Sequence, residues 1–122
     1  MLFHITSASE LARAREAGEY RPAGFAVEGF IHCSHPHQVT AVANRLFRGR
    51  GDLVLLEIAP RGLTCPIVEE NLEGGTEVYP HVYGPLPLSA VARVHELVCG
   101  AGGTFELPSS VHAESSTSEE RA

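Results

Sequence analysis

The chain contains no lysine, and all nine of its basic residues are arginines. A mechanism through a lysine Schiff base or through the lysine of a P-loop is therefore excluded. Cysteine is scarce as well: Cys33, Cys65 and Cys99 are widely spaced, and no two of them form a Cys-x-x-Cys pair. An odd number at this spacing argues against a disulfide framework and against a cysteine zinc site. We expect a reducing, cytoplasmic setting.

Long apolar runs and an excess of positive charge are also missing. No run approaches the roughly 20 residues of a membrane-spanning helix, so we expect no membrane partner. The amino terminus lacks the basic stretch and the long apolar region of a secretory signal. The formal net charge is −6, and an acidic surface argues against a nucleic-acid partner.

What is present is the size and the apolar pattern of one α+β domain. The chain has 122 residues, and we place a single domain at residues 1–108. Residues 109–122 are polar and aperiodic, which predicts a disordered tail. The expected strands span residues 2–6, 29–34, 52–58, 67–70, 77–83 and 88–98; the last segment also has apolar residues at helical spacing, and we favour the strand. The run 52–58 is almost continuously apolar, which predicts the centre of a sheet. Pro80 lacks an amide donor, which predicts an edge strand or a bulge.

Two early helices complete the predicted fold. Ser7 and Glu10 have the spacing of a capping box and Gly18 is a natural stop, so we expect a helix between Ser7 and Gly18. The second helix follows Ser34, which can cap it, with Pro36 in its first turn. Its apolar stripe has helical spacing and consists of Val39, Val42, Ala43, Leu46 and Phe47. Early helices and mostly late strands predict an α+β class with a largely antiparallel sheet.

Seven histidines are many for so short a chain. His4, His32 and His81 occupy equivalent places in their expected strands, with less polar neighbours pointing to the opposite face. If these strands are adjacent, their shared face also carries two hydroxyls and two phenols, those of Thr6, Ser34, Tyr79 and Tyr83. Such a face is either exposed to solvent or forms a ligand cleft. The alternative is a set of unconnected histidines on the surface or hydrogen-bonded in the core.

A metal site is a second interpretation of the histidines. His32, His35 and His37 have His-x-x-His and His-x-His spacing, which suits zinc or another metal that prefers imidazole. The three would have to converge across a strand-to-helix turn, with Glu28 or Cys33 as a further ligand. We favour the alternative, in which His35 and His37 are solvated residues at a helix start.

Nucleophilic and carboxylate chemistry have weaker support. Cys33 and His32 are neighbours on a strand and point to opposite faces, so His32 is poorly placed as a base for Cys33. Glu69 and Glu70 diverge for the same reason, so only one of them can face a cleft. We take Glu69 as the candidate, against the alternative of a solvated acidic strand end.

Several blocks of the sequence together resemble the family called domain of unknown function 952. The blocks are His4-Ile5-Thr6, Glu28-Gly29-Phe30-Ile31-His32-Cys33-Ser34, Gln38, Asp52-Leu53, Glu69 and Tyr79-Pro80-His81-Val82-Tyr83-Gly84-Pro85-Leu86. The resemblance covers about residues 2–108, and the order and spacing of its blocks make it specific.

This family in turn resembles, more distantly, the ADP-ribosyltransferase superfamily. The resemblance implies a split β-sandwich that holds NAD in a cleft between two small sheets. It also implies that His4 and Thr6 hold the nucleotide and that His32 and Ser34 contact ribose or phosphate. Tyr83 belongs to the same cofactor-binding face.

One departure from the superfamily bears on the chemistry. His81 stands where most of these transferases have a glutamate that stabilises the ribose cation, and an imidazole cannot replace a carboxylate in that role. Either Glu69 supplies the carboxylate, or the chemistry is not ordinary ADP-ribosylation. His81 would then act as an acid, a base or a donor to an anionic oxygen.

The leading hypothesis is a domain that binds a nucleotide-type small molecule, NAD or an ADP-ribosyl nucleotide, in a histidine-lined cleft. If it is an enzyme, it cleaves or transfers at the nicotinamide–ribose bond, with His32, His81 and Glu69 as catalytic residues. One alternative is a non-catalytic module of the same fold that binds a small anionic ligand or a protein partner. A metal-dependent hydrolase is the third interpretation.

Overall fold

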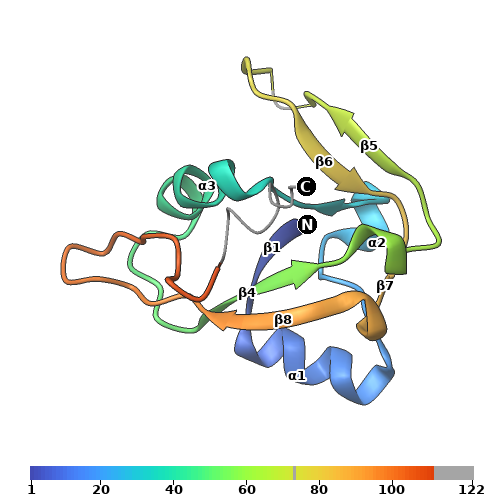
Figure 1. Cartoon of the computed structure of the whole chain (residues 1–122), viewed down its shortest axis with the longest axis horizontal. Helices are drawn as coiled ribbons and strands as arrows, with labels where there is room; N and C mark the ends of the chain where they lie inside the picture. Colours follow the sequence, from blue (N-terminus) through green and yellow to red (C-terminus); the bar gives the residue numbers. More distant parts are fainter. Residues whose placement is uncertain (73, 112–122) are drawn as a thin grey trace, which may run out of the picture.

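Three small antiparallel sheets form the framework of the domain. The computed structural model describes residues 1–72 and 74–111 (Figure 1). The first sheet contains β1 (Leu2–Ser7), β4 (Leu53–Ile58) and β8 (Val91–Glu96) in the order β1-β4-β8. β4 therefore has a neighbour on each edge, and the prediction that its apolar run lies at the centre of a sheet is confirmed.

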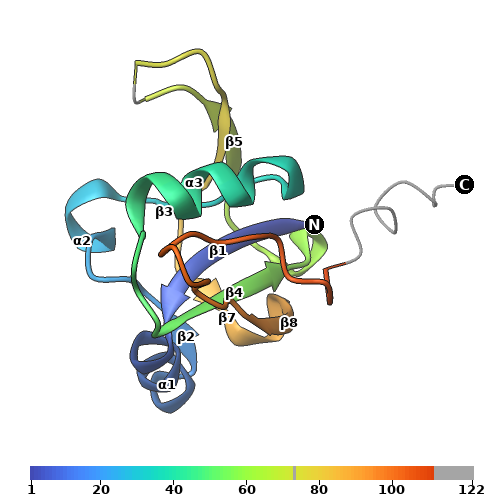
Figure 2. The ribbon, with the colours of Figure 1, turned by 90° about the vertical axis from the view of Figure 1, so that its left-hand side faces the viewer.

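The other two sheets have shorter strands. β2 (Glu19–Tyr20) pairs with β7 (Leu86–Pro87). The third sheet has the order β3-β6-β5, from β3 (Ile31–His32), β6 (Tyr79–Val82) and β5 (Ile67–Glu70). The end of the β5–β6 hairpin projects away from the first sheet (Figures 1 and 2). The domain is thus a small one of mixed α and β structure, with antiparallel sheets and few helices.

The helices lie mainly in the first half of the chain. α1 spans Ala8–Ala17, α2 spans Phe25–Glu28 and α3 spans Val39–Leu46. As predicted, Ser7 caps α1, because its hydroxyl accepts the Glu10 N–H at 3.1 Å. No helix in the described residues is both long enough and apolar enough to cross a membrane.

The start of the third helix differs in detail from the prediction. A single 3₁₀ turn, Pro36–Gln38, precedes α3, and His35 rather than Ser34 caps that turn. Ser34 is engaged elsewhere, because its backbone pairs with Phe3 of β1. A strand partner therefore takes Ser34 out of the capping position, while Pro36 does occupy the first turn.

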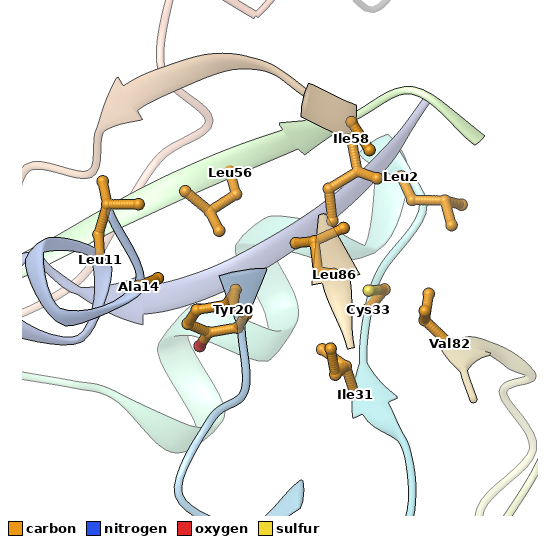
Figure 3. Packing of buried hydrophobic residues seen from close by; sticks show 11 residues of the cluster. Leu2, Leu11, Ala14, Tyr20, Ile31, Cys33, Leu56, Ile58, Val82 and Leu86 are labelled. Carbon is orange, nitrogen blue, oxygen red and sulfur yellow. The ribbon is translucent and has the colours of Figure 1, made fainter. Parts of the chain in front are cut away.

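The core lies on both faces of β4. On one face, Leu56 and Ile58 belong to a buried cluster with residues of α1 and of the two short sheets (Figure 3). On the other face, Leu53 and Leu55 contact residues of α3 and the carboxyl-terminal segment. α1 and α3 accordingly lie on opposite sides of the first sheet (Figure 2). Because β4 is buried on both faces, its sequence is an apolar run rather than an alternation.

The third sheet departs from the prediction at Pro80. Its strand β6 is the middle strand rather than an edge strand. Proline is tolerated there because β3 pairs with β6 only at Ile31 and His32, so the nitrogen of Pro80 lies past the end of that ladder. The Pro80 carbonyl still accepts the Cys33 N–H at 3.1 Å. The strand expected over residues 29–34 is correspondingly reduced to β3.

The predicted tail, residues 109–122, lies mostly outside the described residues. Residues 109–111 are described, and Val111 is only 8% exposed. It packs in a cluster with Phe3, Val39 and Leu55. The packed part of the chain therefore reaches at least Val111.

Candidate functional site

A cavity of about 340 Å³ opens where the first and third sheets meet. The two sheets are joined at Phe3 and Ser34, which exchange hydrogen bonds of 2.9 Å and 2.7 Å. Beyond this bridge, α3 forms the opposite wall. The lining residues come from β1, from β3 and the residues after it, from α3 and from β6: Phe3, His4, Ile5, His32, Cys33, Ser34, Val42, Arg45, Leu46, Phe47 and Tyr79. The volume falls within the range of small-molecule sites, roughly 300–1,000 Å³.

The free edge of β1 presents backbone groups to this cavity. In an antiparallel strand, successive residues direct their N–H and C=O groups to alternate edges. Phe3 directs both groups away from β4, toward Ser34. Ile5 lies two residues further along β1 and lines the cavity, so its N–H and C=O also point away from β4, where they have no backbone partner among the described residues.

His4 is held as a neutral imidazole. Burial lowers the pKa of His4 to about 4, although its hydrogen bond to the His32 carbonyl partly opposes this shift. The neutral ring has one proton. Because a carbonyl can only accept, that proton lies on Nδ1, which donates to the His32 carbonyl at 2.6 Å.

The tautomer of His4 determines the direction of the hydrogen bonds behind it. Nε2 of His4 carries no proton, so it accepts the Tyr20 hydroxyl at 2.7 Å. The phenol has only one proton, so in its second contact, 2.8 Å from Thr6 Oγ1, the Thr6 hydroxyl is the donor. Burial raises the pKa of Tyr20 to about 12, which keeps the phenol protonated. Thr6 thus supports His4 through Tyr20 and does not line the cavity.

His32 is exposed and is one of the residues that line the cavity. Its Nε2 lies 3.1 Å from Glu28 Oε1, a contact within four residues of the chain. Its ring packs edge-on against Phe30, at 4.8 Å between centroids, and against His81, at 5.1 Å. His32 therefore links the cavity to a buried aromatic cluster behind it.

His81 lies in that cluster and is 1% exposed. It stacks on Phe30 at 4.4 Å, and its Nδ1 donates to Glu70 Oε2 at 2.8 Å. The Tyr83 hydroxyl donates to the same carboxylate oxygen. Hydrogen bonds from Tyr83 and His81 lower the pKa of Glu70. The remaining ring nitrogen, Nε2, is buried without a hydrogen-bond partner among the described residues. A carboxylate-bound imidazole with one unused nitrogen can accept a proton.

Glu69 lies apart from this arrangement. Both of its carboxylate oxygens lie 2.9 Å from His35 Nε2. Neighbouring residues on a strand do diverge as expected, but Glu70 and not Glu69 is the one beside His81. Burial raises the pKa of the Cys33 thiol to about 12, so Cys33 is not a nucleophile near neutral pH.

The comparison with known families follows the same blocks of sequence. Residues 5–94 match the model of a family described as a protein of unknown function, DUF952. The chain belongs to the DUF952 family. The family resemblance inferred from the sequence blocks is thereby confirmed, and the family's description specifies no activity.

This DUF952 domain is similar to protein CC0527 from Caulobacter crescentus. An X-ray structure of CC0527 shares 34% identity and a TM-score of 0.78, over 87% of this chain and 93% of that one. An X-ray structure of a double mutant gives 33% and 0.77 with the same coverage. A solution NMR structure gives 33% and 0.70, over 87% and 91%. No curated protein matches the chain.

The DUF952 domain brings only some of the sequence-predicted site residues together. His4, His32 and Ser34 line the cavity. Thr6 lies behind His4, His81 and Tyr83 lie behind His32, and Glu69 pairs with His35. For the metal interpretation, no group of three His, Cys, Asp or Glu side chains suited to a metal ion occurs in residues 1–72 and 74–111.

Two contributors, Arg45 and Tyr20, were missed by the sequence-based reasoning. Arg45 lines the cavity from α3, next to the predicted apolar stripe. Arg45 and Tyr79 also line an adjoining hollow of about 270 Å³, which extends the site toward the β5–β6 hairpin. Tyr20 belongs to none of the helices and strands expected from the sequence, yet it is 1% exposed. Its signal was a large aromatic residue two positions after Gly18, the glycine that ends α1.

Proposed function

We propose that this DUF952 domain binds NAD or a related ADP-ribosyl nucleotide in the cavity between β1, β3 and α3. The single observation that carries the proposal is the composition of the cavity wall: two histidines, a serine hydroxyl and an arginine around an otherwise largely apolar hollow. The resemblance of the His4-x-Thr6 and His32-x-Ser34 blocks to ADP-ribosyltransferases supports this ligand class.

The charges of the wall favour an anionic ligand. Among the described residues that line the cavity, Arg45 is the only formally charged side chain, and the one carboxylate of the adjoining hollow is that of Glu77. Arginine binds phosphate through charge-assisted, bidentate hydrogen bonds. His4, which is neutral, adds no charge at pH 7. A pyrophosphate in the cavity would therefore lie beside the guanidinium of Arg45, on a chain whose net charge is −6.

The polar groups suit the remaining parts of such a nucleotide. The free N–H and C=O of Ile5 offer a donor and an acceptor side by side, the complement of a planar amide. Ser34 and His32 supply hydrogen-bonding groups for ribose hydroxyls or phosphate. The apolar residues of α3 supply surface against which a flat ring packs.

If the domain also turns over NAD, His81 is the candidate acid or base. Its Nδ1 is held by Glu70, while its unpartnered Nε2 lies within the ring cluster that reaches His32. The sequence-based choice of Glu69 as cation stabiliser would require this carboxylate to leave His35. The second candidate, binding without turnover, is favoured by one specific observation: no carboxylate occurs among the described residues that line the cavity.

Calorimetric titration with ADP-ribose and with NAD tests the binding proposal. Loss of a hydrogen bond to a charged group is worth about 1.5–3 kcal/mol, so Arg45→Ala should weaken binding roughly 10- to 100-fold. Arg48→Ala is the matched control, because it removes the same charge close by on an exposed residue outside the cavity wall. His32→Ala should also weaken binding.

Nicotinamide release from NAD separates the two candidates. Release that depends on His81 supports the enzyme, whereas tight ADP-ribose binding without release supports the binding module. The proposal is wrong if neither nucleotide binds the wild type, or if Arg45→Ala and Arg48→Ala bind equally well.

A further inference from the structure

A second network of hydrogen-bonded side chains lies on the same face of the first sheet as α3, and none of its residues lines the cavity described above. His95 of β8 is 4% exposed. Its Nε2 lies 2.7 Å from Glu57 Oε1 of β4, and its Nδ1 lies 2.6 Å from Ser110 Oγ. Ser110 belongs to the carboxyl-terminal segment and is itself exposed. A carboxylate, a buried imidazole and an exposed hydroxyl are thus joined in a row.

We propose that Ser110, His95 and Glu57 form a serine nucleophile site, with reactivity toward acyl esters. The geometry meets the requirement for an activated serine, which is a base within about 2.6–3.2 Å of the hydroxyl and a third group that orients the base. His95 is the catalytic base and Glu57 is the positioning residue. This proposal does not depend on nucleotide binding in the cavity.

The hydrogen-bond partners of His95 determine which of its ring nitrogens carries the proton. A carboxylate can only accept, so the Nε2 proton is directed at Glu57. In the neutral ring, Nδ1 is then bare and accepts the Ser110 hydroxyl proton. This is the tautomer that a general base needs. The carboxylate of Glu57 also stabilises the imidazolium that forms when the serine attacks.

An open depression beside Ser110 gives a substrate access. It has a volume of about 650 Å³ and is lined by Ser110 together with Glu96 and Glu106. Two carboxylates disfavour an anionic substrate at this place. The acyl ester is therefore neutral or cationic, which distinguishes it from the anionic nucleotide proposed for the cavity.

The reaction balances without a further cofactor. Ser110 Oγ bonds to the ester carbonyl carbon as its proton moves to His95 Nδ1. The tetrahedral intermediate expels the alcohol, which takes that proton, and an acyl-serine remains. Water, deprotonated by His95, then attacks the acyl-serine and releases the carboxylic acid and the free hydroxyl.

Labelling of the full chain with a neutral alkyl fluorophosphonate, followed by intact-mass and peptide mass spectrometry, tests the site. The expected product is one phosphonyl group on Ser110, with loss of fluoride. Ser110→Ala should abolish the label. Ser109→Ala is the matched control, because Ser109 lines the same depression but lies outside this hydrogen-bonded chain in the described structure, and it should label like wild type.

Glu57 variants distinguish a positioning role from a merely structural one. General-base assistance is worth roughly 100-fold or more, and Glu57→Gln should slow labelling toward that extent. Glu57→Asp keeps the carboxylate and should recover part of the rate, with thermal melts showing that both variants fold. The proposal is overturned if the wild type is not labelled, or if Ser109 and Ser110 are labelled alike. Equal labelling rates in Glu57→Gln and wild type would show that Glu57 does not position His95.

Discussion

The stability of the domain should fall between pH 7 and pH 5 because His4 is neutral when it is buried. Burial lowers the pKa of His4 to about 4 in the folded state, against 6.5 for an unperturbed histidine. Between these two values the unfolded chain binds a proton that the folded chain does not. The free energy of unfolding therefore rises with pH across this window, and acid favours unfolding.

The size of the effect follows from the two pKa values. A group that titrates at 6.5 in the unfolded chain and at about 4 in the folded chain costs about 2 kcal/mol of stability between pH 7 and pH 5. Above pH 5 the loss of stability caused by His4 is separated from the loss caused by protonation of carboxylates, which occurs at lower pH. Hydrogen bonds from Tyr83 and His81 lower the pKa of Glu70, so its contribution is lost only at more acidic pH.

Urea denaturation at pH 7, 6 and 5 measures the loss in wild type and in His4→Asn. Asparagine keeps a donor for the His32 carbonyl but does not titrate, so the variant should be less stable at pH 7 and less sensitive to pH. The free energy of unfolding changes with pH at a different slope in the two proteins, and that difference gives the contribution of His4 alone. A variant that loses the same free energy as wild type between pH 7 and pH 5 would refute the reasoning.

Three further substitutions test the packing around the site. Tyr20→Phe leaves His4 Nε2 buried without its donor, so urea denaturation should show a loss of about 1–3 kcal/mol; an unchanged midpoint would contradict the hydrogen-bond assignment. Gly84→Ala would place a Cβ 2.6 Å from Cys65 Cβ. Overpacking of this kind costs about 1–3 kcal/mol, and a thermal melt equal to wild type would show that the segment has room. Leu55→Ala removes a side chain that is 0% exposed from the centre of β4, and calorimetry should show a loss of about 2–5 kcal/mol; a loss below 1 kcal/mol would mean that Leu55 is not in the core.

Local features of the fold were predictable because each depends on a few adjacent residues. The capping of α1 by Ser7 needs only a hydroxyl three residues before an amide. The central position of β4 follows from an apolar run too continuous for a half-exposed strand. The family relationship was visible in the order of short blocks, and it holds over residues 5–94.

Features that depend on pairing were not predictable from local sequence. Pro80 lies in a middle strand rather than in the predicted edge strand. The missing N–H of Pro80 matters only where the neighbouring strand β3 pairs with it, and the length of β3 cannot be derived from the residues around Pro80. The choice of Glu69 over Glu70 depended on which face of β5 turns toward His81, and alternation alone gives two equal answers. Sequence could show that only one of the two glutamates would face the cluster, and the register of β5 and β6 settles which one does.

Because the chain has no lysine, its basic side chains are arginine and histidine, and the two differ in what it costs to bury them. An arginine cannot lose its proton inside a protein, so burying one requires a permanently paired charge. Histidine can be buried neutral, as His4 is, or beside a carboxylate, as His81 and His95 are at 1% and 4% exposure.

The two carboxylate–imidazole pairs whose histidine is buried differ in what the second ring nitrogen meets. His81 joins Glu70, 11 residues away in sequence, and its other nitrogen is unpartnered in the described structure. His95 joins Glu57, 38 residues away, and its other nitrogen meets Ser110. No local motif joins residues at these separations, so the strand register creates both pairs. In each pair the carboxylate holds one imidazole nitrogen in place, and the chemistry proposed for His81 and for His95 rests on the other nitrogen.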